Sequence, residues 1–317
     1  MKKLDEIKII EIFQKKNQNK LFVSEDVEVY RVGNQLCVST IDTLVESTDV
    51  PPKMKFSEIA RKSIVSSLSD FAAKGVRPRF AIISISIPRK VNPKQIKELA
   101  RGFARAAKEY NIKILGGDTN EGKEITISVV LFGFAKKIVK RKGARNNDRI
   151  FVTGEFGNSA SGLQVLLRGK KADDFFKKIA INSVKKPQCR LEFGIKNQDM
   201  FSSSMDSSDG LSTCLNEMAR QSNKQFFIDK IPASTKLFEF ARQNKLDPLN
   251  LIFNGGEEYE IVFTASPRNV KKLQAFAKKS KINLMEIGRV TQGKGVVLMH
   301  NGKKSSLKDK GWKHFKN

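Results

Sequence analysis

Ile112-Lys113-Ile114-Leu115-Gly116-Gly117-Asp118-Thr119 is an apolar run that leads directly into two glycines and an aspartate. The apolar part predicts a short β-strand over residues 112–115. The paired glycines after it predict a turn where a phosphate or a metal ion can approach the main chain. Because α/β folds bind ligands beyond the carboxyl ends of their strands, the stretch favours such a fold with Asp118 at its binding edge. A plain turn capped by the aspartate explains the stretch equally well.

The segment before this stretch contains a second aspartate in a helical setting. Residues 57–74 repeat apolar side chains at intervals of three and four, which predicts a helix that ends at Gly75. Asp70 follows Leu68 by two positions, about 200° round that helix. We therefore expect the Asp70 carboxylate to lie off the buried stripe and to be free to face a site.

The other N-terminal elements follow from the same rules. Asn92-Pro93 is a helix cap followed by a first-turn proline. Amphipathic and alternating patterns predict helices over 4–16 and 92–110 and strands over 80–88 and 124–135. Together with the strand at 112–115, these elements indicate an N-terminal domain of α+β type with a mixed sheet.

A basic, polar stretch over 136–148 separates two halves of the chain. A length of 317 residues exceeds what one compact core usually holds, so we expect two domains, over 1–137 and 148–317. The second half begins with a strand over 149–153 and a glycine-spaced loop over 154–162, and then alternates helices and strands, which predicts an α/β domain. That loop resembles a phosphate loop in composition but lacks the Gly-Lys-Ser/Thr ending, and loop-to-helix packing explains it equally well.

The composition limits the classes of partner. The net charge of +26 fits either a polyanionic partner or a lysine-rich solvated surface. We favour the second interpretation because the lysines are spread along predicted helices, and no stretch combines arginines with aromatics as RNA-stacking surfaces do. Cys37, Cys189 and Cys214 are far apart and form no metal spacing, which indicates a reduced, cytoplasmic protein. No segment approaches the length of a membrane helix, so no membrane partner is expected.

Isolated acidic residues occur in six settings rich in small residues. These are Ser24-Glu25-Asp26, Ile41-Asp42-Thr43-Leu44-Val45-Glu46, Leu68-Ser69-Asp70-Phe71-Ala72-Ala73, Gly116-Gly117-Asp118-Thr119, Met205-Asp206-Ser207-Ser208-Asp209-Gly210 and Gly255-Gly256-Glu257-Glu258-Tyr259. Hard cations such as Mg²⁺ prefer carboxylate and carbonyl oxygens and bind phosphates alongside the protein. Such scattered carboxylates suit a site for several metal ions and a polyphosphate. Helix capping accounts for one of Asp206, Ser208 and Asp209, but not for all three.

Other candidate residues carry weaker signals. His300 and His314 match no metal or catalytic-triad spacing, so histidine-based catalysis lacks its usual parts. Arg141 is one charge in a basic linker, where most side chains are simply solvated. Trp312 fits either a core position or an aromatic platform, and from the sequence alone we favour the core.

Taken together and in order, these motifs resemble the thiamine-monophosphate kinase family. This family belongs to a superfamily with aminoimidazole-ribonucleotide synthetase, selenophosphate synthetase and a hydrogenase maturation protein. The resemblance covers about residues 5 to 315, and five motifs in the same order carry it. It implies an enzyme that uses ATP and Mg²⁺ to phosphorylate thiamine monophosphate to thiamine diphosphate. It also implies a homodimer in which the N-terminal sheets of two chains form a β-barrel.

The resemblance assigns a role to individual residues. A cluster of Mg²⁺ ions would be held by Asp26, Thr40, the Ile41 carbonyl, Asp42, Asp70, Asp118 and Asp206, with a further ion at Asp209. ATP would contact Gly117, Asp118, Arg141 and Ser208, and thiamine monophosphate would contact Asp49, Glu257 and Trp312. No catalytic base is expected, because a phosphate monoester is already an anionic nucleophile and phosphoryl transfer mainly needs alignment and charge neutralisation.

The sequence departs from the family pattern at three positions. Glu25 stands where a second aspartate is usual, so Asp26 is expected to keep the metal role and Glu25 is not required for it. Ile41 replaces a usual threonine, which is compatible with a role for its carbonyl alone. Asp49 occupies a position where bacterial members of the family carry histidine. The segment around it resembles the archaeal members instead.

Two other functions are compatible with the sequence. One is an ATP-dependent synthetase of the aminoimidazole-ribonucleotide type, and the other is a basic RNA-binding protein without catalysis. Selenophosphate synthesis and hydrogenase maturation are less expected, because the cysteines that these activities use, near the N-terminus and at the C-terminus, are missing.

Overall fold

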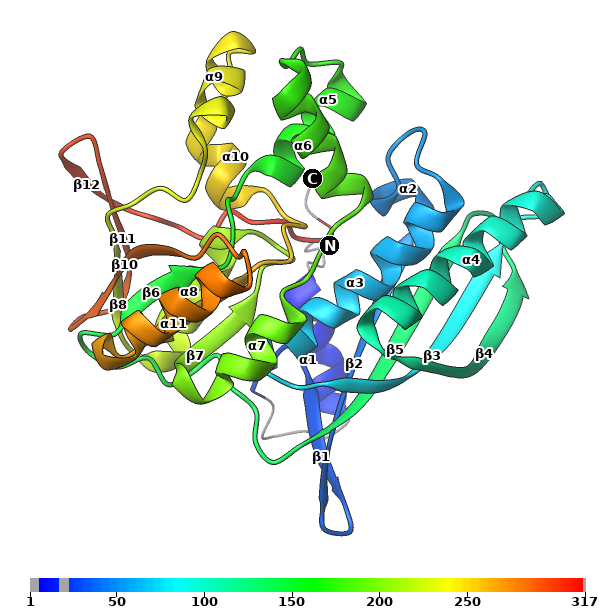
Figure 1. Ribbon diagram of the computed structural model, residues 1–317, viewed down its shortest axis with the longest axis horizontal. Helices are drawn as coiled ribbons and strands as arrows, with labels where there is room; N and C mark the ends of the chain where they lie inside the picture. Colours follow the sequence, from blue (N-terminus) through cyan, green and yellow to red (C-terminus); the bar gives the residue numbers. More distant parts are fainter. Residues whose placement is uncertain (1–5, 17–22, 316–317) are drawn as a thin grey trace.

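The structure is a computed structural model that describes residues 6–16 and 23–315. Two mixed β-sheets form its framework, and helices cover both of them (Figure 1). The chain begins with helix α1 (Glu6–Lys16), whose first two predicted residues, 4 and 5, lie outside the described part. The apolar side chains of α1 are not a buried stripe, since Ile12 and Phe13 are exposed and Ile9 is half-buried.

The first sheet has five strands in the order β1-β2-β5-β3-β4. Its strands are β1 (Glu28–Val32), β2 (Gln35–Val45), β3 (Pro78–Ile87), β4 (Lys113–Glu121) and β5 (Thr126–Ala135). Only the β3–β4 pair is parallel within this sheet. Figure 1 shows helices α3 (Phe56–Lys74) and α4 (Pro93–Tyr110) on one face of the sheet, with the short helix α2 (Glu46–Asp49) at its end.

The predicted ends of α3 and α4 are confirmed. Gly75 closes α3 in the left-handed conformation, with a φ of 70°. Asn92 caps α4 by accepting hydrogen bonds from the backbone of Lys94 and Gln95. These local signals position both helices against the sheet, and α3 carries Asp70 near its end.

The expected turn at Gly116-Gly117-Asp118 is not present. Instead β4 continues through these residues to Glu121, because the whole stretch pairs with β3. A register shift between Ala81 and Ile82 leaves Leu115 without a partner residue in β3, and a Cβ on Gly117 would lie 1.7 Å from the Ile83 carbonyl oxygen. Gly117 is therefore needed for a close approach of two strands at the edge of the sheet, whereas a Cβ on Gly116 would meet no atom within 4 Å.

The second sheet has seven strands in the order β12-β11-β8-β10-β6-β9-β7. Its strands are β6 (Arg149–Val152), β7 (Phe201–Asp206), β8 (Gln225–Ile228), β9 (Ile261–Ala265), β10 (Met285–Thr291), β11 (Gly295–His300) and β12 (Lys303–Ser306). Only β8 and β11 run parallel among these described pairs, so the expected α/β domain is a mixed α+β arrangement. A strand's carboxyl end therefore does not locate the ligand here as it does in a parallel sheet.

The helices of the second half vary in length. They are α5 (Asn158–Arg168), α6 (Asp174–Lys185), α7 (Leu191–Asn197), α8 (Leu211–Ser222), α9 (Thr235–Gln243), α10 (Pro248–Asn254) and α11 (Val270–Lys279), with the 3₁₀ turns η1 (Gln198–Met200) and η2 (Pro267–Asn269). Helix α8 buries Leu211, Leu215 and Met218. No helix within the described ranges is long and apolar enough to cross a membrane.

Helix α3 lies between the two halves of the molecule. It contacts β2 and β5 of the first sheet and also α7, β7 and β9 of the second half. Its residues Leu68 and Phe71 belong to one apolar core together with Phe193 and Phe263. Because α3 is covered on nearly all sides, Asp70 faces the interior between the halves rather than a solvent-exposed side of the helix.

The contact between α3 and α7 depends on a glycine. A Cβ on Gly194 would lie 1.9 Å from the Ala72 carbonyl oxygen. We predict that Gly194→Ala lowers the free energy of unfolding by about 1 kcal/mol or more, because the overpacking cost exceeds the gain in helix propensity. Urea denaturation gives the measurement. Lys196→Ala, an exposed change in the same helix, should stay within about 0.5 kcal/mol of the parent, and equal effects for both variants would contradict the close-packing argument.

Candidate active site

Four buried or half-buried carboxylates meet between the two halves of the chain. Asp70 comes from α3, Asp42 from β2 and Asp206 from the end of β7, and Asp26 precedes β1. One carboxylate oxygen each from Asp26, Asp70 and Asp206 lies within 4.8 Å of the others. Thus four of the five aspartates that were expected to converge, separated by up to 180 positions in the sequence, form a single acidic cluster.

The four members of this carboxylate cluster have unequal surroundings. Thr40 donates its hydroxyl hydrogen to Asp70 Oδ2 at 2.6 Å, and Ser69 donates to Asp206 Oδ2 at 2.8 Å. Asp42 Oδ2 is buried and has no hydrogen-bond partner within the described chain. A buried polar oxygen without a partner is rare in folded proteins, so this atom indicates a missing ligand.

Burial and mutual repulsion shift the pKa values of the cluster. Burial raises the pKa of Asp70 well above its ordinary value, and the three neighbouring carboxylates add to that increase. Burial also raises the pKa of Asp206 to about 7, with a further contribution from the charge of Asp26. The pKa of Asp42 is raised by burial and by Asp26 in the same way. The cluster therefore holds more negative charge than its protein surroundings neutralise.

Asp26 is the exception, because two cations contact it. Burial alone would raise its pKa, but Lys74 and Arg141 hold that pKa below its ordinary value. Lys74 is fully buried, and its Nζ lies 2.9 Å from Asp26 Oδ2. Arg141 donates from Nε to Asp26 Oδ1 at 2.7 Å. Arg141 is thus not a solvated linker residue but one member of the site.

Glu25 also has a clear structural role. Its carboxylate lies 2.6 Å from Lys74 Nζ and accepts a hydrogen bond from the backbone of Arg141. A buried lysine needs a counter-charge, and Glu25 provides one in addition to Asp26, which is a member of the cluster. Glu25 therefore contributes to the site as a partner of Lys74, and the metal role of Asp26 stays a prediction.

The cluster fits a hard divalent cation. Its donors are carboxylate and hydroxyl oxygens, which Mg²⁺ prefers, and at least three carboxylate oxygens are close enough to surround an ion. Two unit charges 4 Å apart repel by about 4 kcal/mol at an effective dielectric of about 20. A bound divalent cation would remove this repulsion and supply the partner that Asp42 lacks.

A cavity of about 220 Å³ opens beside the cluster. We call it the central pocket, and its lining includes seven predicted site residues: Asp42, Asp49, Asp206, Ser208, Asp209, Glu257 and Trp312. Backbone hydrogen bonds join the loops that carry them, from Glu257 to the Ser208 carbonyl at 2.7 Å and from Trp312 to the Asp209 carbonyl at 2.9 Å. Three distant loops are therefore fixed as one wall of the pocket.

The polar residues before α8 do not cap that helix. Its N-cap residue is Gly210, and no side chain bonds to the first turn. All three polar residues of this segment, Asp206, Ser208 and Asp209, therefore line the central pocket. From the sequence, one of them was expected to cap the helix instead. Burial raises the pKa of Asp209 to about 6, and the charge of Glu6 adds to that increase.

Lys62 is a pocket residue that the sequence did not indicate. Its side chain is buried, its Nζ lies 2.5 Å from Glu257 Oε1, and it donates to the Asp49 carbonyl at 2.7 Å. Lys62 and Ser66 precede Asp70 by eight and four positions, so all three share one face of α3. This spacing of four in the sequence could have indicated that Lys62 faces the same site as Asp70. It was not sufficient, because an isolated lysine in a helix usually lies at the surface.

Trp312 does not belong to the core. Its side chain is 57% exposed and lines the central pocket, so the interpretation of a core position is wrong. His314 lines the same pocket and lies edge-on to Trp312, with ring centroids 6.1 Å apart. An exposed indole at a pocket mouth is suited to contact a flat or cationic ligand.

The glycine-spaced loop over 154–162 holds a protein carboxylate rather than facing the pocket. Glu258 Oε1 accepts hydrogen bonds from the backbone of Gly157 and Ser159, both at 2.8 Å. Burial raises the pKa of Glu258 to about 8. Since Glu258 occupies the start of α5, the structure favours internal packing over phosphate binding as the role of this loop.

Two predicted residues, Gly117 and Asp118, lie away from the carboxylate cluster, and the side chain of a third, Ile41, is exposed. Gly117 and Asp118 are exposed on β4, and the Asp118 carboxylate accepts a hydrogen bond from Asn120 at 2.5 Å. Ile41 is 62% exposed in β2, next to Asp42. Within one chain, the structure therefore does not bring Asp118 to the other predicted metal ligands.

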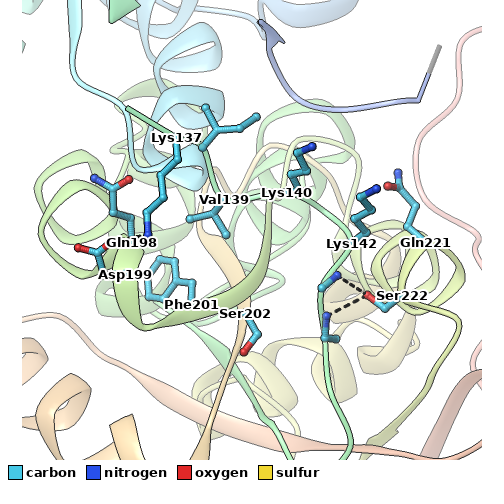
Figure 2. Close-up of a pocket in the computed structure, with 13 residues that line it drawn as sticks. Lys137, Val139, Lys140, Lys142, Gln198, Asp199, Phe201, Ser202, Gln221 and Ser222 are labelled. Atoms are coloured by element: carbon cyan, nitrogen blue, oxygen red, sulfur yellow. Dashed lines mark hydrogen bonds and ion pairs between the residues drawn. The ribbon is translucent and has the colours of Figure 1, made fainter. Parts of the chain in front are cut away.

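A second hollow, of about 450 Å³, lies along the linker between the halves. Figure 2 shows Lys137, Lys140 and Lys142 along it, and Ser222 accepts two backbone hydrogen bonds from Gly143 and Ala144. The linker thus directs lysines to this hollow, whereas the intervening Arg141 contacts Asp26 in the cluster.

Comparisons with known proteins agree with this architecture. Residues 24–135 match the N-terminal domain of AIR synthase related proteins, and residues 145–301 match their C-terminal domain. Among solved structures, one described as "AaThiL complexed with AMPPCP and TMP" superposes with a TM-score of 0.85 and 29% identity, covering 98% of this chain and 97% of that one. The hydrogenase maturation protein HypE shares the fold at a TM-score of 0.73 and 16% identity, over 88% and 90% of the two chains.

Two relatives in sequence are thiamine-monophosphate kinases. The protein from Nitrosopumilus maritimus is 52% identical over 316 residues, covering 100% of both chains. The protein from Pyrococcus horikoshii is 33% identical over 318 residues, covering 100% of this chain and 98% of its own. The chain therefore belongs to the thiamine-monophosphate kinase family.

Proposed function

We propose that the protein transfers the γ-phosphoryl group of ATP to thiamine monophosphate and so forms thiamine diphosphate. The observation that carries this proposal is the buried carboxylate cluster, which opens onto a pocket lined by Glu257 and Trp312. A related solved structure contains AMPPCP and TMP, and relatives of full length carry the kinase name. These relatives favour the kinase over a synthetase or an RNA-binding protein.

Several Mg²⁺ ions are part of the proposal. They would be held by Asp26, Asp42, Asp70 and Asp206 with Thr40 and the Ile41 carbonyl, and by Asp209 nearer the pocket mouth. When bound, these ions neutralise the charge of two phosphate-bearing substrates. The protein's task is then to place carboxylates so that ATP and the acceptor are aligned for in-line transfer.

Three residues would contact ATP. Arg141 stands at the cluster and Ser208 at the pocket wall, where phosphate oxygens of ATP would reach them. Gly117 is exposed on β4 beside Asp118, and its backbone would contact ATP from that strand.

The acceptor would occupy the mouth of the central pocket. Thiamine carries a cationic thiazolium ring, and Asp49, Glu257 and the Trp312 face offer the charge and the aromatic surface that suit a cation. Lys62 holds Glu257 in place through their ion pair.

We also infer a homodimer built through the N-terminal sheet. Helices cover one face of this sheet, while Ile41, Ile82 and Phe134 are 62%, 40% and 47% exposed. Exposed apolar side chains on a sheet favour burial against a second copy, and a closed β-barrel would remove the sheet's open edges. We further propose that residues 1–137 form the domain that binds ATP and Mg²⁺ and makes the dimer, and that residues 148–317 form the second domain.

We also propose a cytoplasmic location, because the described cysteines form no disulfide bonds. Cys37, Cys189 and Cys214 are all buried and free, as expected where thiols stay reduced.

The activity itself is the first prediction from the proposed function. Purified protein with ATP, Mg²⁺ and thiamine monophosphate should form thiamine diphosphate, measured by chromatography. Asp70→Asn should lose at least about 100-fold in kcat, because it removes one cluster carboxylate. The same change removes like-charge repulsion, so the metal-free variant should melt no lower than the parent. Asp199→Asn, an exposed change outside the site, serves as control, and near-normal turnover of Asp70→Asn would refute the metal assignment.

A second prediction separates the substrates. Trp312→Ala should raise the KM for thiamine monophosphate by about tenfold and leave the KM for ATP within about twofold, because the indole faces only the acceptor. Phe175→Ala removes an aromatic ring of similar exposure from α6 and should change neither value. Equal increases in both KM values for Trp312→Ala would contradict the assignment.

The third prediction concerns pH. The folded protein binds protons on Asp70 and Asp206 more tightly than the unfolded chain does, because both pKa values are raised. Their contribution to stability is therefore complete below about pH 4 and is lost as the pH rises towards and past 7. With EDTA present, the melting temperature should fall between about pH 5 and 8, and less so for Asp206→Asn. Mg²⁺ should raise the melting temperature more at pH 8 than at pH 5, and a metal effect independent of pH would contradict this proton linkage.

A further inference from the structure

Lys74 is fully buried at the end of α3, one helical turn after Asp70. Its ammonium group offers three N–H donors, and the structure places an acceptor near each of them. Glu25 Oε2 lies 2.6 Å from Nζ, Asp26 Oδ2 lies 2.9 Å from it, and the Ser204 carbonyl oxygen lies 3.1 Å from it. Burying a charged group is costly unless its charge and its donors have partners. The surroundings of this side chain therefore suit a lysine specifically.

The three acceptors belong to different segments of the site. Glu25 and Asp26 precede β1, whereas Ser204 is in β7, two residues before Asp206. A contact with the Ser204 carbonyl therefore fixes β7 close to the point where it presents Asp206. One ammonium group thus joins α3, β7 and the segment before β1, and each of these segments carries an aspartate of the carboxylate cluster.

Glu25 extends this network to the linker. Its Oε2 accepts a hydrogen bond from the backbone N–H of Arg141 at 3.1 Å, in addition to its contact with Lys74. The Lys74 carbonyl accepts another from the backbone N–H of Val139 at 3.2 Å. The linker backbone is thus anchored at two points, and the Arg141 side chain is directed to Asp26 Oδ1. The place of Arg141 at the cluster therefore depends on Lys74 and Glu25.

The two cations do not use the whole carboxylate of Asp26. A carboxylate offers about four lone-pair sites. Arg141 donates from Nε and Nη2 to Oδ1, and Lys74 approaches Oδ2. About one lone-pair site on Oδ2 therefore remains. Since one Asp26 oxygen lies within 4.8 Å of oxygens of Asp70 and Asp206, Asp26 is held in place and can still bind a metal ion.

We propose that Lys74 is a positioning residue for the metal ions and the nucleotide. With Glu25 as a counter-charge, it fixes Asp26 where a divalent cation is received and Arg141 where the phosphates of ATP are received. Groups behind the metal ligands orient those ligands and so raise the affinity for the ion. Lys74 does not line the central pocket, so it acts on the acceptor only weakly. This inference rests on the proposed kinase function.

The test removes the ion pair without changing the net charge. In the double variant Lys74→Met with Glu25→Gln, both side chains nearly keep their lengths, and Asp26 keeps Arg141 as a partner. Replacing a buried ion pair by uncharged groups often leaves stability nearly unchanged. Mn²⁺ prefers the same oxygen ligands as Mg²⁺ and serves as the probe. Titrated by calorimetry without nucleotide, it should bind the double variant at least about tenfold more weakly than the parent.

Electrostatics alone predicts the opposite result. Loss of the positive charge beside Asp26 would by itself tighten the binding of a divalent cation. Weaker binding to a folded variant therefore reports lost positioning of the carboxylate. Circular dichroism at the titration temperature checks that the variant is folded. Unchanged or tighter Mn²⁺ binding would show that Lys74 has only a structural role and would overturn the proposal.

Steady-state kinetics give a second readout. The KM for ATP at saturating Mg²⁺ should rise by about tenfold in the double variant, because the backbone of Arg141 loses its anchor. The KM for thiamine monophosphate should stay within about twofold of the parent value. Equal increases in both values would indicate a general loosening of the site and would contradict a role at the metal ions and nucleotide.

A second ion pair of α3 provides the matched control. Arg61 donates from Nη2 to Glu109 Oε1 at 2.9 Å, and neither residue lines the central pocket or belongs to the carboxylate cluster. The charge-balanced variant Arg61→Met with Glu109→Gln should leave the Mn²⁺ affinity and both KM values within about twofold of the parent. A loss of Mn²⁺ affinity in this control as large as in the Lys74 variant would assign the effect to α3 as a whole and overturn the proposal.

One further variant covers a failure to fold. Glu25→Gln alone leaves Lys74 with Asp26 as its counter-charge, and it should bind Mn²⁺ more weakly than the parent, by less than the double variant. Unchanged binding would again overturn the proposal. A parent that binds Mn²⁺ but makes no thiamine diphosphate would refute the proposed function, and the Mn²⁺ comparison would still decide this inference. A parent that binds no Mn²⁺ would overturn both.

Discussion

Repulsion among buried carboxylates is the constraint on which this structure depends. Asp42, Asp70 and Asp206 all have raised pKa values, since burial and neighbouring charges both disfavour ionisation. A fold that keeps such groups together must hold them by other means. Here the packing of α3 against both halves does so, through a single apolar core that includes Leu68 and Phe71. The site is thus strained electrostatically in the free protein, and bound cations would relieve this strain.

Internal cations offset part of this repulsion. Lys74 and Arg141 both contact Asp26, and Lys62 contacts Glu257. These three cations contact Asp26 or Glu257. In the described chain, no ion pair joins a positively charged side chain to Asp42, Asp70 or Asp206. The protein therefore leaves the central charge to be neutralised by ligands. This division is expected of an enzyme whose substrates are both anionic and must be brought together.

Local signals in the sequence predicted the helices well and the edge strand poorly. Periodicity and caps located α3 and α4 because helix ends depend on neighbouring residues, such as Gly75 and Asn92. The path of β4 depends instead on pairing with β3, a contact that no local pattern encodes, so the glycines looked like a turn. The exposed position of Trp312 likewise follows from how the loop after β12 joins Asp209.

The same distinction applies to the site. Aspartates flanked by small residues were recognisable because helix caps and turns account for only some of them, and Asp26, Asp70 and Asp206 do converge. Lys62 and Lys74 were not recognisable, since among 59 lysines and arginines a buried one looks like any other in sequence. Their burial is decided by the second half of the molecule, which covers α3 and leaves both ammonium groups beside carboxylates.

The overall charge and the local charge of the site have opposite signs, and this opposition has a physical consequence. A net charge of +26 attracts phosphate-bearing molecules from a distance, with a strength that salt reduces. Close to the carboxylate cluster the same anions are repelled unless divalent cations accompany them. Bound divalent cations would let nucleotide enter where free nucleotide is repelled, and the cluster would then select the charge state of its ligand as well as its position.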